Sequence, residues 1–177
     1  MKKLLYQHDN NLAMKQFNNH GFTFIELILY ISIVTIMLSA IVPFGWNVVK
    51  SSVKSSVEQE VYSQARYVSE RIKYEIRNAS GITTVSSNSI SLTNFSPDTT
   101  TVIDLSAGKI RINKNGTGAT NLNSNDTTAS SLTFTNYTSG SNTKNIGFSF
   151  SVASNLGALQ QYQESVSIRG DAELRSN

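Results

Sequence analysis

The stretch GFTFIEL (residues 21–27) opens a long apolar segment and decides the fold of this 177-residue chain. Between Phe22 and Trp46 the only formally charged side chain is Glu26. A helix over residues 22–46, at about 1.5 Å per residue, is roughly 37 Å long and exceeds the ~30 Å hydrocarbon core of a bilayer. We therefore predict a transmembrane helix. Its internal carboxylate costs roughly 2.5–3.5 kcal/mol on insertion scales, which predicts a partner for Glu26.

The segment before this helix, residues 1–21, is polar and carries three lysines against one aspartate. By the positive-inside rule, it is expected to stay in the cytoplasm. An ordinary secretory signal has its small-residue cleavage site after the apolar region, whereas Gly21 lies before it. Cleavage at Gly21 would remove residues 1–21 as a leader and leave the apolar helix on the mature chain.

Gly21, Phe22, Glu26 and the apolar helix resemble the cleavage and methylation motif of type IV prepilins, a family that includes pilus subunits and the pseudopilins of type II secretion. The resemblance implies that prepilin peptidase cuts between Gly21 and Phe22 and methylates the new amine of Phe22. Pro43 lies where pilins commonly have a helix-kinking proline. Because its nitrogen cannot donate to the carbonyl of Ser39, we expect a kink there.

Two departures from the family pattern bear on the type of subunit. Thr35 lies where many major pilins have glycine, and a chain without cysteine cannot form the disulfide-closed C-terminal loop of many pilins. The low-complexity, cysteine-free sheet domain favours a minor pilin or a pseudopilin over an abundant major pilin.

Glu26 has two interpretations. In the first, it is a tolerated membrane acid that becomes protonated or reaches the interface. In the second, it pairs with the positively charged amine of Phe22, most usefully that of a neighbouring subunit entering a filament, where the low dielectric strengthens the attraction. We favour the second. The implied partners are other pilin or pseudopilin subunits, an inner-membrane assembly platform, and membrane lipid before assembly.

The helical pattern continues beyond Trp46, and residues 47–80 are expected to form an amphipathic helix. Apolar residues recur every three or four positions, as on a helix that packs along one face. These residues are Val49, Val53, Val57, Val61, Ala65, Val68, Ile72, Ile76 and Ala79. We predict one kinked helix over residues 22–79 with Gly81 as its stop, and solvated Arg66–Glu70 and Arg71–Glu75 pairs.

Residues 81–177 alternate between apolar and polar positions and predict a β-rich domain. Strands are expected over residues 82–85, 89–95, 101–105, 109–113, 131–137, 146–152 and 162–168, with a turn at 106–108 and exposed loops at 113–130 and 139–143. The inward-facing candidates are Ile90, Leu92, Ile103, Leu105, Ile110, Ile112, Leu132, Phe134, Phe148, Phe150, Val166 and Ile168. The expected fold is α+β, a long kinked N-terminal helix packed on a small antiparallel sheet.

The composition argues against catalysis. There is no cysteine, and both histidines, His8 and His20, lie in the predicted leader, so a mature chain would lack nucleophile–histidine pairs and imidazole or thiolate metal sites. The spacing of its carboxylates does not indicate a catalytic pair. Removing the leader also takes the formal net charge from +3 to +1. We therefore expect no enzymatic activity, cofactor, metal or small-molecule substrate.

Three other patterns have weaker interpretations. The Gly116-Thr117-Gly118 run lacks the lysine of a phosphate-binding loop and is expected to be a surface loop. Asn123, Asn125 and Asp126 offer oxygens for calcium but lack the glycine and distal glutamate of an EF-hand, so we do not favour a calcium site. Five Asn-x-Ser/Thr sequons leave glycosylation open because the chain is rich in these residues. They begin at Asn78, Asn94, Asn115, Asn125 and Asn136.

Basic and aromatic residues interleave over residues 62–77, as on helices that hold nucleic acid. They are Tyr62, Arg66, Tyr67, Arg71, Lys73, Tyr74 and Arg77. Neighbouring glutamates neutralise much of this face, and we expect the tyrosines to pack against the sheet. Packing is therefore favoured over DNA binding.

Taken together, the sequence predicts a structural subunit of a type IV pilus or a type II secretion-like pseudopilus. The subunit would be a single-pass cell-membrane protein with an extracytoplasmic C-terminal domain, which then joins a filament in the envelope or at the cell surface. The alternative is a signal-anchored surface adhesin or binding protein that never polymerises. An anchored hydrolase is a third and weaker hypothesis, because the mature chain would lack histidine and cysteine.

Overall fold

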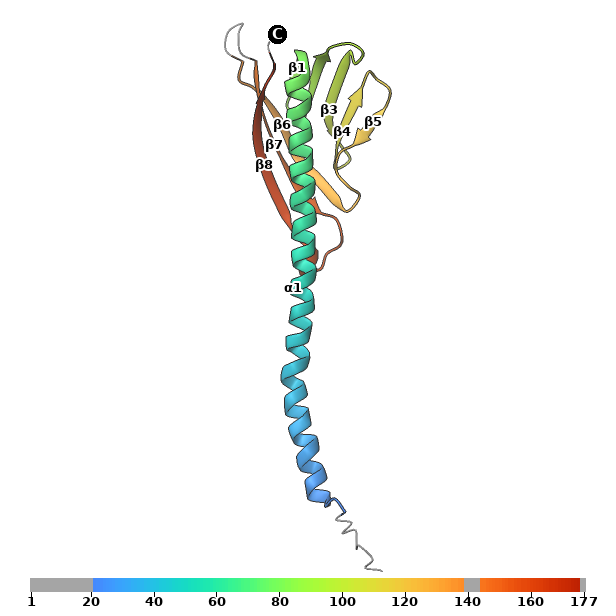
Figure 1. Cartoon of the computed structure of the whole chain (residues 1–177), viewed down its shortest axis with the longest axis vertical. Helices are drawn as coiled ribbons and strands as arrows, with labels where there is room; N and C mark the ends of the chain where they lie inside the picture. Colours follow the sequence, from blue (N-terminus) through green and yellow to red (C-terminus); the bar gives the residue numbers. More distant parts are fainter. Residues whose placement is uncertain (1–20, 139–143, 176–177) are drawn as a thin grey trace, which may run out of the picture. The chain divides into compact units, whose positions relative to one another are not determined.

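The computed structural model describes residues 21–138 and 144–175 and divides the chain into two compact units, residues 1–44 and 45–177. The predicted leader up to residue 20, with both histidines, and the predicted loop 139–143 lie outside the described residues. Helix α1 (Phe24–Asn78) begins in the first unit and ends in the second (Figure 1).

In the first unit, α1 is apolar and long enough to cross a membrane. Its large hydrophobic side chains are exposed, as expected for a helix that lipid or other helices surround. The helix continues through Pro43, and the boundary between the two units, at residues 44 and 45, directly follows this proline. The kink at Pro43 remains a prediction.

The described residues of the second unit form eight strands in two antiparallel sheets. The first sheet has the order β1-β2-β3-β4-β5, and the second has the order β6-β7-β8. Their bounds are β1 (Ala79–Ser86), β2 (Ser89–Asn94), β3 (Thr100–Ser106), β4 (Lys109–Lys114), β5 (Ala119–Asn121), β6 (Thr127–Asn136), β7 (Asn145–Ser154) and β8 (Ser165–Glu173). A short 3₁₀ helix, η1 (Gln160–Tyr162), precedes β8.

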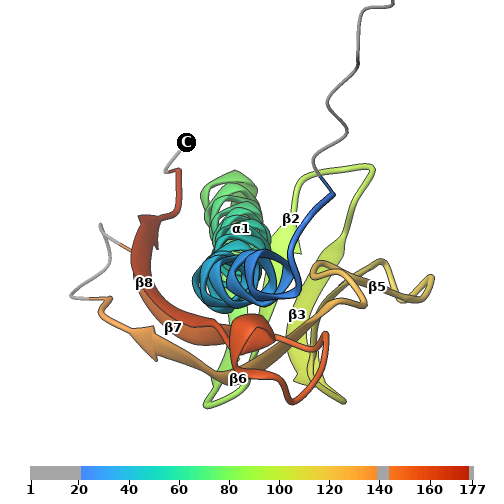
Figure 2. The ribbon, with the colours of Figure 1, turned by 90° about the horizontal axis from the view of Figure 1, so that it is seen from below.

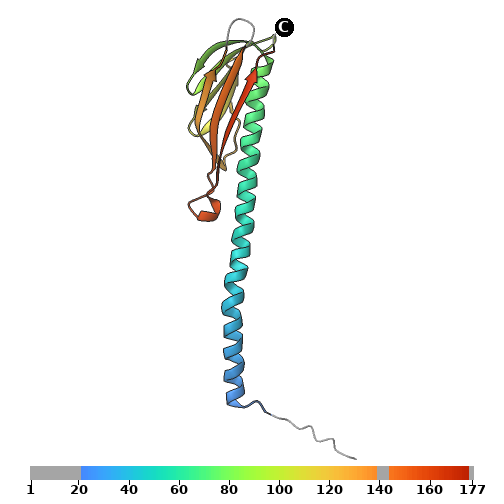
Figure 3. The same cartoon turned by 90° about the vertical axis from the view of Figure 1, so that its left-hand side faces the viewer.

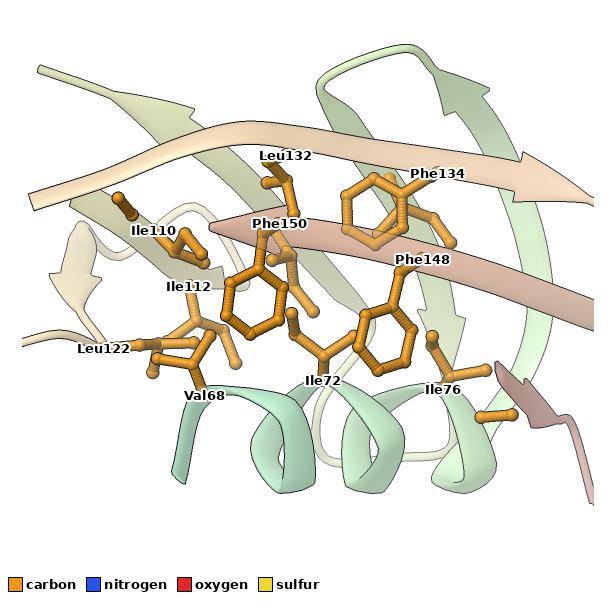
Figure 4. Packing of buried hydrophobic residues seen from close by; sticks show 14 of the residues in the cluster. Val68, Ile72, Ile76, Ile110, Ile112, Leu122, Leu132, Phe134, Phe148 and Phe150 are labelled. Carbon is orange, nitrogen blue, oxygen red and sulfur yellow. The ribbon is translucent and has the colours of Figure 1, made fainter. Parts of the chain in front are cut away.

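The C-terminal half of α1 lies on the concave side of these sheets (Figures 2 and 3). Its apolar stripe is buried from Val57 to Ile76, and Val53 is partly buried. Figure 4 shows Ile72 between Phe150 and Phe148, with Ile110 and Leu132 on the sheet side of the same core. The helical period of the stripe therefore places one row of apolar side chains against both sheets.

The strands alternate as their sequence predicts. Every predicted inward-facing side chain is buried or packs partly buried against the core, because successive residues of a strand point to opposite faces. The predicted turn at 106–108 is a two-residue hairpin loop between β3 and β4. Ala107 and Gly108 have φ values of 49° and 72°, the left-handed geometry that such tight hairpins use. The α+β prediction is thus confirmed.

Some predicted boundaries are wrong. The helix ends at Asn78, and Gly81 does not act as a stop because the chain passes directly into β1 at Ala79. A register shift between Ala79 and Gly81 accommodates this entry into the sheet. The single sheet expected from the sequence is two sheets. The last predicted strand starts at Ser165, because η1 occupies residues 160–162.

The predicted exposed loop at 113–130 is also wrong, because it contains β5 and the start of β6. Leu122 and Asn123 are buried within it. The Asn123 side chain accepts a hydrogen bond from Ile110 N at 2.9 Å and donates to Thr127 O at 3.0 Å. The buried Asn123 amide thus satisfies a backbone N–H on β4 and a backbone carbonyl on β6. These bonds allow the polar segment to pack on the domain.

Candidate functional site

The N-terminal end of α1 is built by a threonine cap. The Thr23 hydroxyl accepts a hydrogen bond from Glu26 N at 3.3 Å, and Thr23 O accepts one from Leu27 N at 3.1 Å. The spacing Thr23-x-x-Glu26 is that of a capping box, and an acid in the first turn is favoured by the helix dipole by about 0.3–1 kcal/mol. The helix start therefore offsets part of the cost of placing Glu26 in an apolar segment.

Two aromatic rings lie at the start of α1, and one of them, Tyr30, contacts the Glu26 side chain. The Tyr30 hydroxyl donates to Glu26 Oε1 at 3.4 Å, and the rings of Phe22 and Tyr30 meet edge to face with centroids 6.2 Å apart. Glu26 is half-buried, whereas every other residue of the 21–52 range is exposed. The carboxylate therefore lies in a local shelter built by its own helix.

Gly21 lies just outside this shelter and has open space around it. A Cβ atom at Gly21 would meet no heavy atom within 4 Å, and the same holds for Gly45 within α1. The packing of the described chain therefore does not require glycine at either position. A requirement for Gly21 would have to come from another molecule.

Three hydroxyls within the apolar segment are satisfied by the helix backbone. Ser32 and Thr35 each donate to the carbonyl four residues earlier at 2.8 Å, and Ser39 donates to Ile36 O at 2.7 Å. Such bonds let polar side chains lie in a membrane span without an external partner. Glu26 is thus the one charged side chain in a segment, residues 22–46, whose other residues are compatible with a membrane span.

A sequence comparison agrees with the order of these features: Gly21 before Phe22, a capped helix start, and one acid in an apolar helix. A family model for the prokaryotic N-terminal methylation motif matches residues 16–42. This chain carries the type IV prepilin signature. Comparison with curated proteins and with solved structures found no match for the chain.

The prepilin signature belongs to a family of structural proteins. The matched range contains Gly21, Phe22 and Glu26 and ends just before Pro43. It indicates a subunit of the pilin or pseudopilin type that is anchored in the membrane by its apolar helix. The roles of the four individual residues remain predictions.

Outside the prepilin motif, the described residues of the second unit include one buried acid. Glu75 in α1 has a side chain that is 3% exposed, with Arg71 Nη2 at 2.7 Å from Oε1 and Lys114 Nζ at 3.3 Å from Oε2. The Arg71 contact is ionic rather than a well-aligned hydrogen bond, since Oε1 has no partner of hydrogen-bonding geometry. Lys114 also contacts Asp98 at 3.3 Å. The predicted Arg71–Glu75 pair therefore exists, but its position on the solvated face was wrong.

Replacing Lys114 by Met is expected to lower the free energy of unfolding by about 1–3 kcal/mol, because it leaves the buried Glu75 carboxylate with Arg71 alone. The matched change Glu75→Met leaves only partly exposed cations and is expected to be nearly neutral. Denaturant melts of both variants test whether Lys114→Met lowers the free energy of unfolding more than Glu75→Met does. Equal losses of stability in the two variants would contradict it.

The outward face of α1 also corrects the prediction for the tyrosines. Tyr62, Tyr67 and Tyr74 are more than half exposed and do not pack against the sheets. The Arg71 guanidinium lies 5.3 Å from the centre of the Tyr74 ring. Glu70 pairs with Lys73 at 3.0 Å instead of with Arg66, and this hydrogen bond lowers the pKa of the Glu70 carboxyl. Part of the basic run is thus neutralised on the surface itself.

On the domain, a lysine occupies the region weighed for calcium. Lys109 Nζ donates to Ser124 O and to Thr127 O, the latter at 2.8 Å, and the Asn123 amide is fully engaged with backbone groups. An internal ammonium thus takes the carbonyl oxygens that a cation would use. Within residues 21–138 and 144–175, no group of three or more His, Cys, Asp or Glu side chains is placed to hold a metal ion.

The remaining charged pair on the domain surface joins two strands. Arg111 on β4 donates to both carboxylate oxygens of Asp104 on β3, at 2.9 and 2.7 Å. These hydrogen bonds raise the pKa of the Arg111 guanidinium. Because the two residues are opposite each other in the β3–β4 register, the pair supports sheet pairing and needs no ligand.

Proposed function

We propose that this chain is a structural subunit of a type IV pilus or a type II secretion-like pseudopilus, matured by prepilin peptidase and assembled through its N-terminal helix. The observation that carries the proposal is Glu26, a lone acid one turn into an apolar helix that follows Gly21 and Phe22. An anchor that only holds a domain at a membrane gains nothing from such an acid.

Processing is the first step of the proposal. Prepilin peptidase cuts between Gly21 and Phe22, removes the cytoplasmic leader, and methylates the amine of Phe22. The cleavage leaves α1 attached to the domain, so the mature subunit waits in the membrane with its domain on the extracytoplasmic side. The open space around Gly21 supports this step, because an enzyme can approach the backbone there.

Assembly is the second step. The subunit leaves the lipid by packing its apolar helix against the helices of earlier subunits, and Glu26 accepts the charged amine of Phe22 from a neighbour. Opposite charges about 4 Å apart attract by roughly 4 kcal/mol at an effective dielectric of 20. The pairing offsets the cost of burying each charge alone and favours one axial register.

The subtype remains part of the proposal. The low-complexity, cysteine-free sheet domain favours a minor pilin or a pseudopilin over a major pilin. The second candidate function is an anchored adhesin that never polymerises. The exposed tyrosines of α1 favour a second binding surface in either case, because exposed aromatic rings are enriched where proteins meet partners.

Cell fractionation tests the proposed function. Surface filaments, or filaments induced by raised expression in the case of a pseudopilus, are sheared or extracted and separated from membranes. We expect the chain in both fractions, with its mature form in the filaments. A chain confined to the membrane fraction under every condition that yields filaments would contradict the subunit role and support the anchored adhesin.

A further inference from the structure

We infer that Tyr30 is a positioning residue for assembly: its hydroxyl holds the Glu26 carboxylate on its own helix, in the orientation that receives the amine of a neighbouring subunit. This inference rests on the proposed function and extends it to a residue outside the Gly21, Phe22 and Glu26 motif. Tyr30 reaches Glu26 Oε1 at 3.4 Å and contacts the Phe22 ring edge to face.

The spacing explains why these side chains meet. Residues four apart on a helix lie on the same face, so Tyr30 covers one side of Glu26. Phe22 precedes α1, and its ring meets the Tyr30 ring edge to face with centroids 6.2 Å apart. The result is that Glu26 is half-buried within a range of exposed residues. The start of α1 thus partly shelters the acid before any partner arrives.

The Tyr30 hydroxyl also orients the Glu26 carboxylate. A glutamate in lipid lowers its cost by reaching back to the membrane interface, which lies on the Phe22 side of Glu26. The phenol lies one turn further along α1, so its hydrogen bond holds the carboxylate on the helix and away from the interface. The bond therefore opposes pairing of Glu26 with the amine of its own chain.

The carboxylate keeps the capacity to bind a second partner. An ionised carboxylate offers about four lone-pair sites, and the phenol uses one of them on Oε1. The capping bond to Thr23 involves the backbone nitrogen of Glu26 and none of these sites. A neighbouring amine can therefore bind while the Tyr30 bond persists, which is why we assign Tyr30 to positioning and not to competition.

The variant Tyr30→Phe keeps the ring and its contact with Phe22 and removes only the hydroxyl. We expect the ratio of filament-incorporated to membrane-resident chain to fall by about three- to tenfold, the range for one hydrogen bond. Cleavage at Gly21 should be unchanged. The control is Tyr137→Phe, which removes an exposed tyrosine hydroxyl from the β-rich domain and should leave the ratio as in the wild type.

Two further measurements separate positioning from a general role in packing. Combining Tyr30→Phe with Glu26→Gln should lower incorporation no further than Glu26→Gln alone. In addition, ¹³C NMR of the mature chain in lipid nanodiscs should show the Tyr30 Cζ resonance moving in Glu26→Ala, with the Tyr62 resonance unmoved. An unmoved Tyr30 resonance, or an additional loss in the double variant, would overturn the inference.

The inference and the proposed function can fail separately. Loss of incorporation in Glu26→Gln with none in Tyr30→Phe would overturn the positioning role and leave the subunit role intact. Full incorporation of both variants would overturn the proposed pairing of Glu26 and the role of Tyr30 with it. A rise in incorporation for Tyr30→Phe would show that the hydroxyl competes with the amine, which also contradicts the inference.

Discussion

Replacing Glu26 by Gln is expected to lower the ratio of filament-incorporated to membrane-resident chain by more than a hundredfold. The variant leaves the amine of a neighbouring Phe22 without its counter-charge in a packed, water-poor bundle, a defect worth about 3–5 kcal/mol. Membrane insertion should be intact or eased, because the change removes a charge from an apolar helix. The loss should therefore appear in assembly alone, as measured by quantitative immunoblotting at matched expression.

The geometry of the pair can be tested with a shorter acid and a control. Glu26→Asp keeps the charge but shortens its reach, so its incorporation should fall between those of the wild type and Glu26→Gln. Glu58→Gln alters an exposed glutamate of the same helix outside the apolar segment and should have no effect. Unchanged incorporation of Glu26→Gln would contradict the pairing and restore the anchored adhesin as the leading hypothesis.

Replacing Gly21 by Leu is expected to abolish maturation and, with it, assembly. The added side chain would obstruct the approach of prepilin peptidase to the backbone at the cleavage site. A Cβ atom at residue 21 meets no atom of the described chain within 4 Å, so we expect the fold of the subunit not to change. Intact-mass spectrometry of the membrane fraction should find the chain with its leader still attached.

Gly45→Ala is the matched control for this variant. Gly45 also has no neighbour within 4 Å of its Cβ position, and alanine favours the helix in which it lies. Its processing and incorporation should equal those of the wild type. Normal cleavage of Gly21→Leu would show that glycine at residue 21 is not required, and would remove the processing step from the proposal.

The helical part of the fold could be predicted because its determinants are local. A single acid among apolar residues marks the membrane segment, and the spacing from Val57 to Ile76 predicts the buried face of α1. The order of two sheets depends on pairings between distant strands, which local alternation does not contain. The 113–130 segment was missed for the same reason, since Asn123 and Lys109 meet only in the folded domain.

The candidate site likewise has features that local sequence predicts and features that depend on distant contacts. The type and spacing of Gly21, Phe22 and Glu26 predict their roles, which remain predictions, whereas Thr23 and Tyr30 were missed. The threonine had a readable signal, the Thr-x-x-Glu spacing of a capping box. Tyr30 had only its position four residues after Glu26. Burial of Glu75 had no local signal, because its second partner, Lys114, comes from a strand far along the chain.

The most direct test of the account is the intact mass of this chain in purified filaments. We predict a mass equal to residues 22–177 plus one methyl group, with fragmentation that places the methyl on the amine of Phe22. That result would show that the chain in the filament has been cleaved, methylated and assembled. A filament chain that retains residues 1–21, or filaments that lack the chain in cells that express it, would contradict the account.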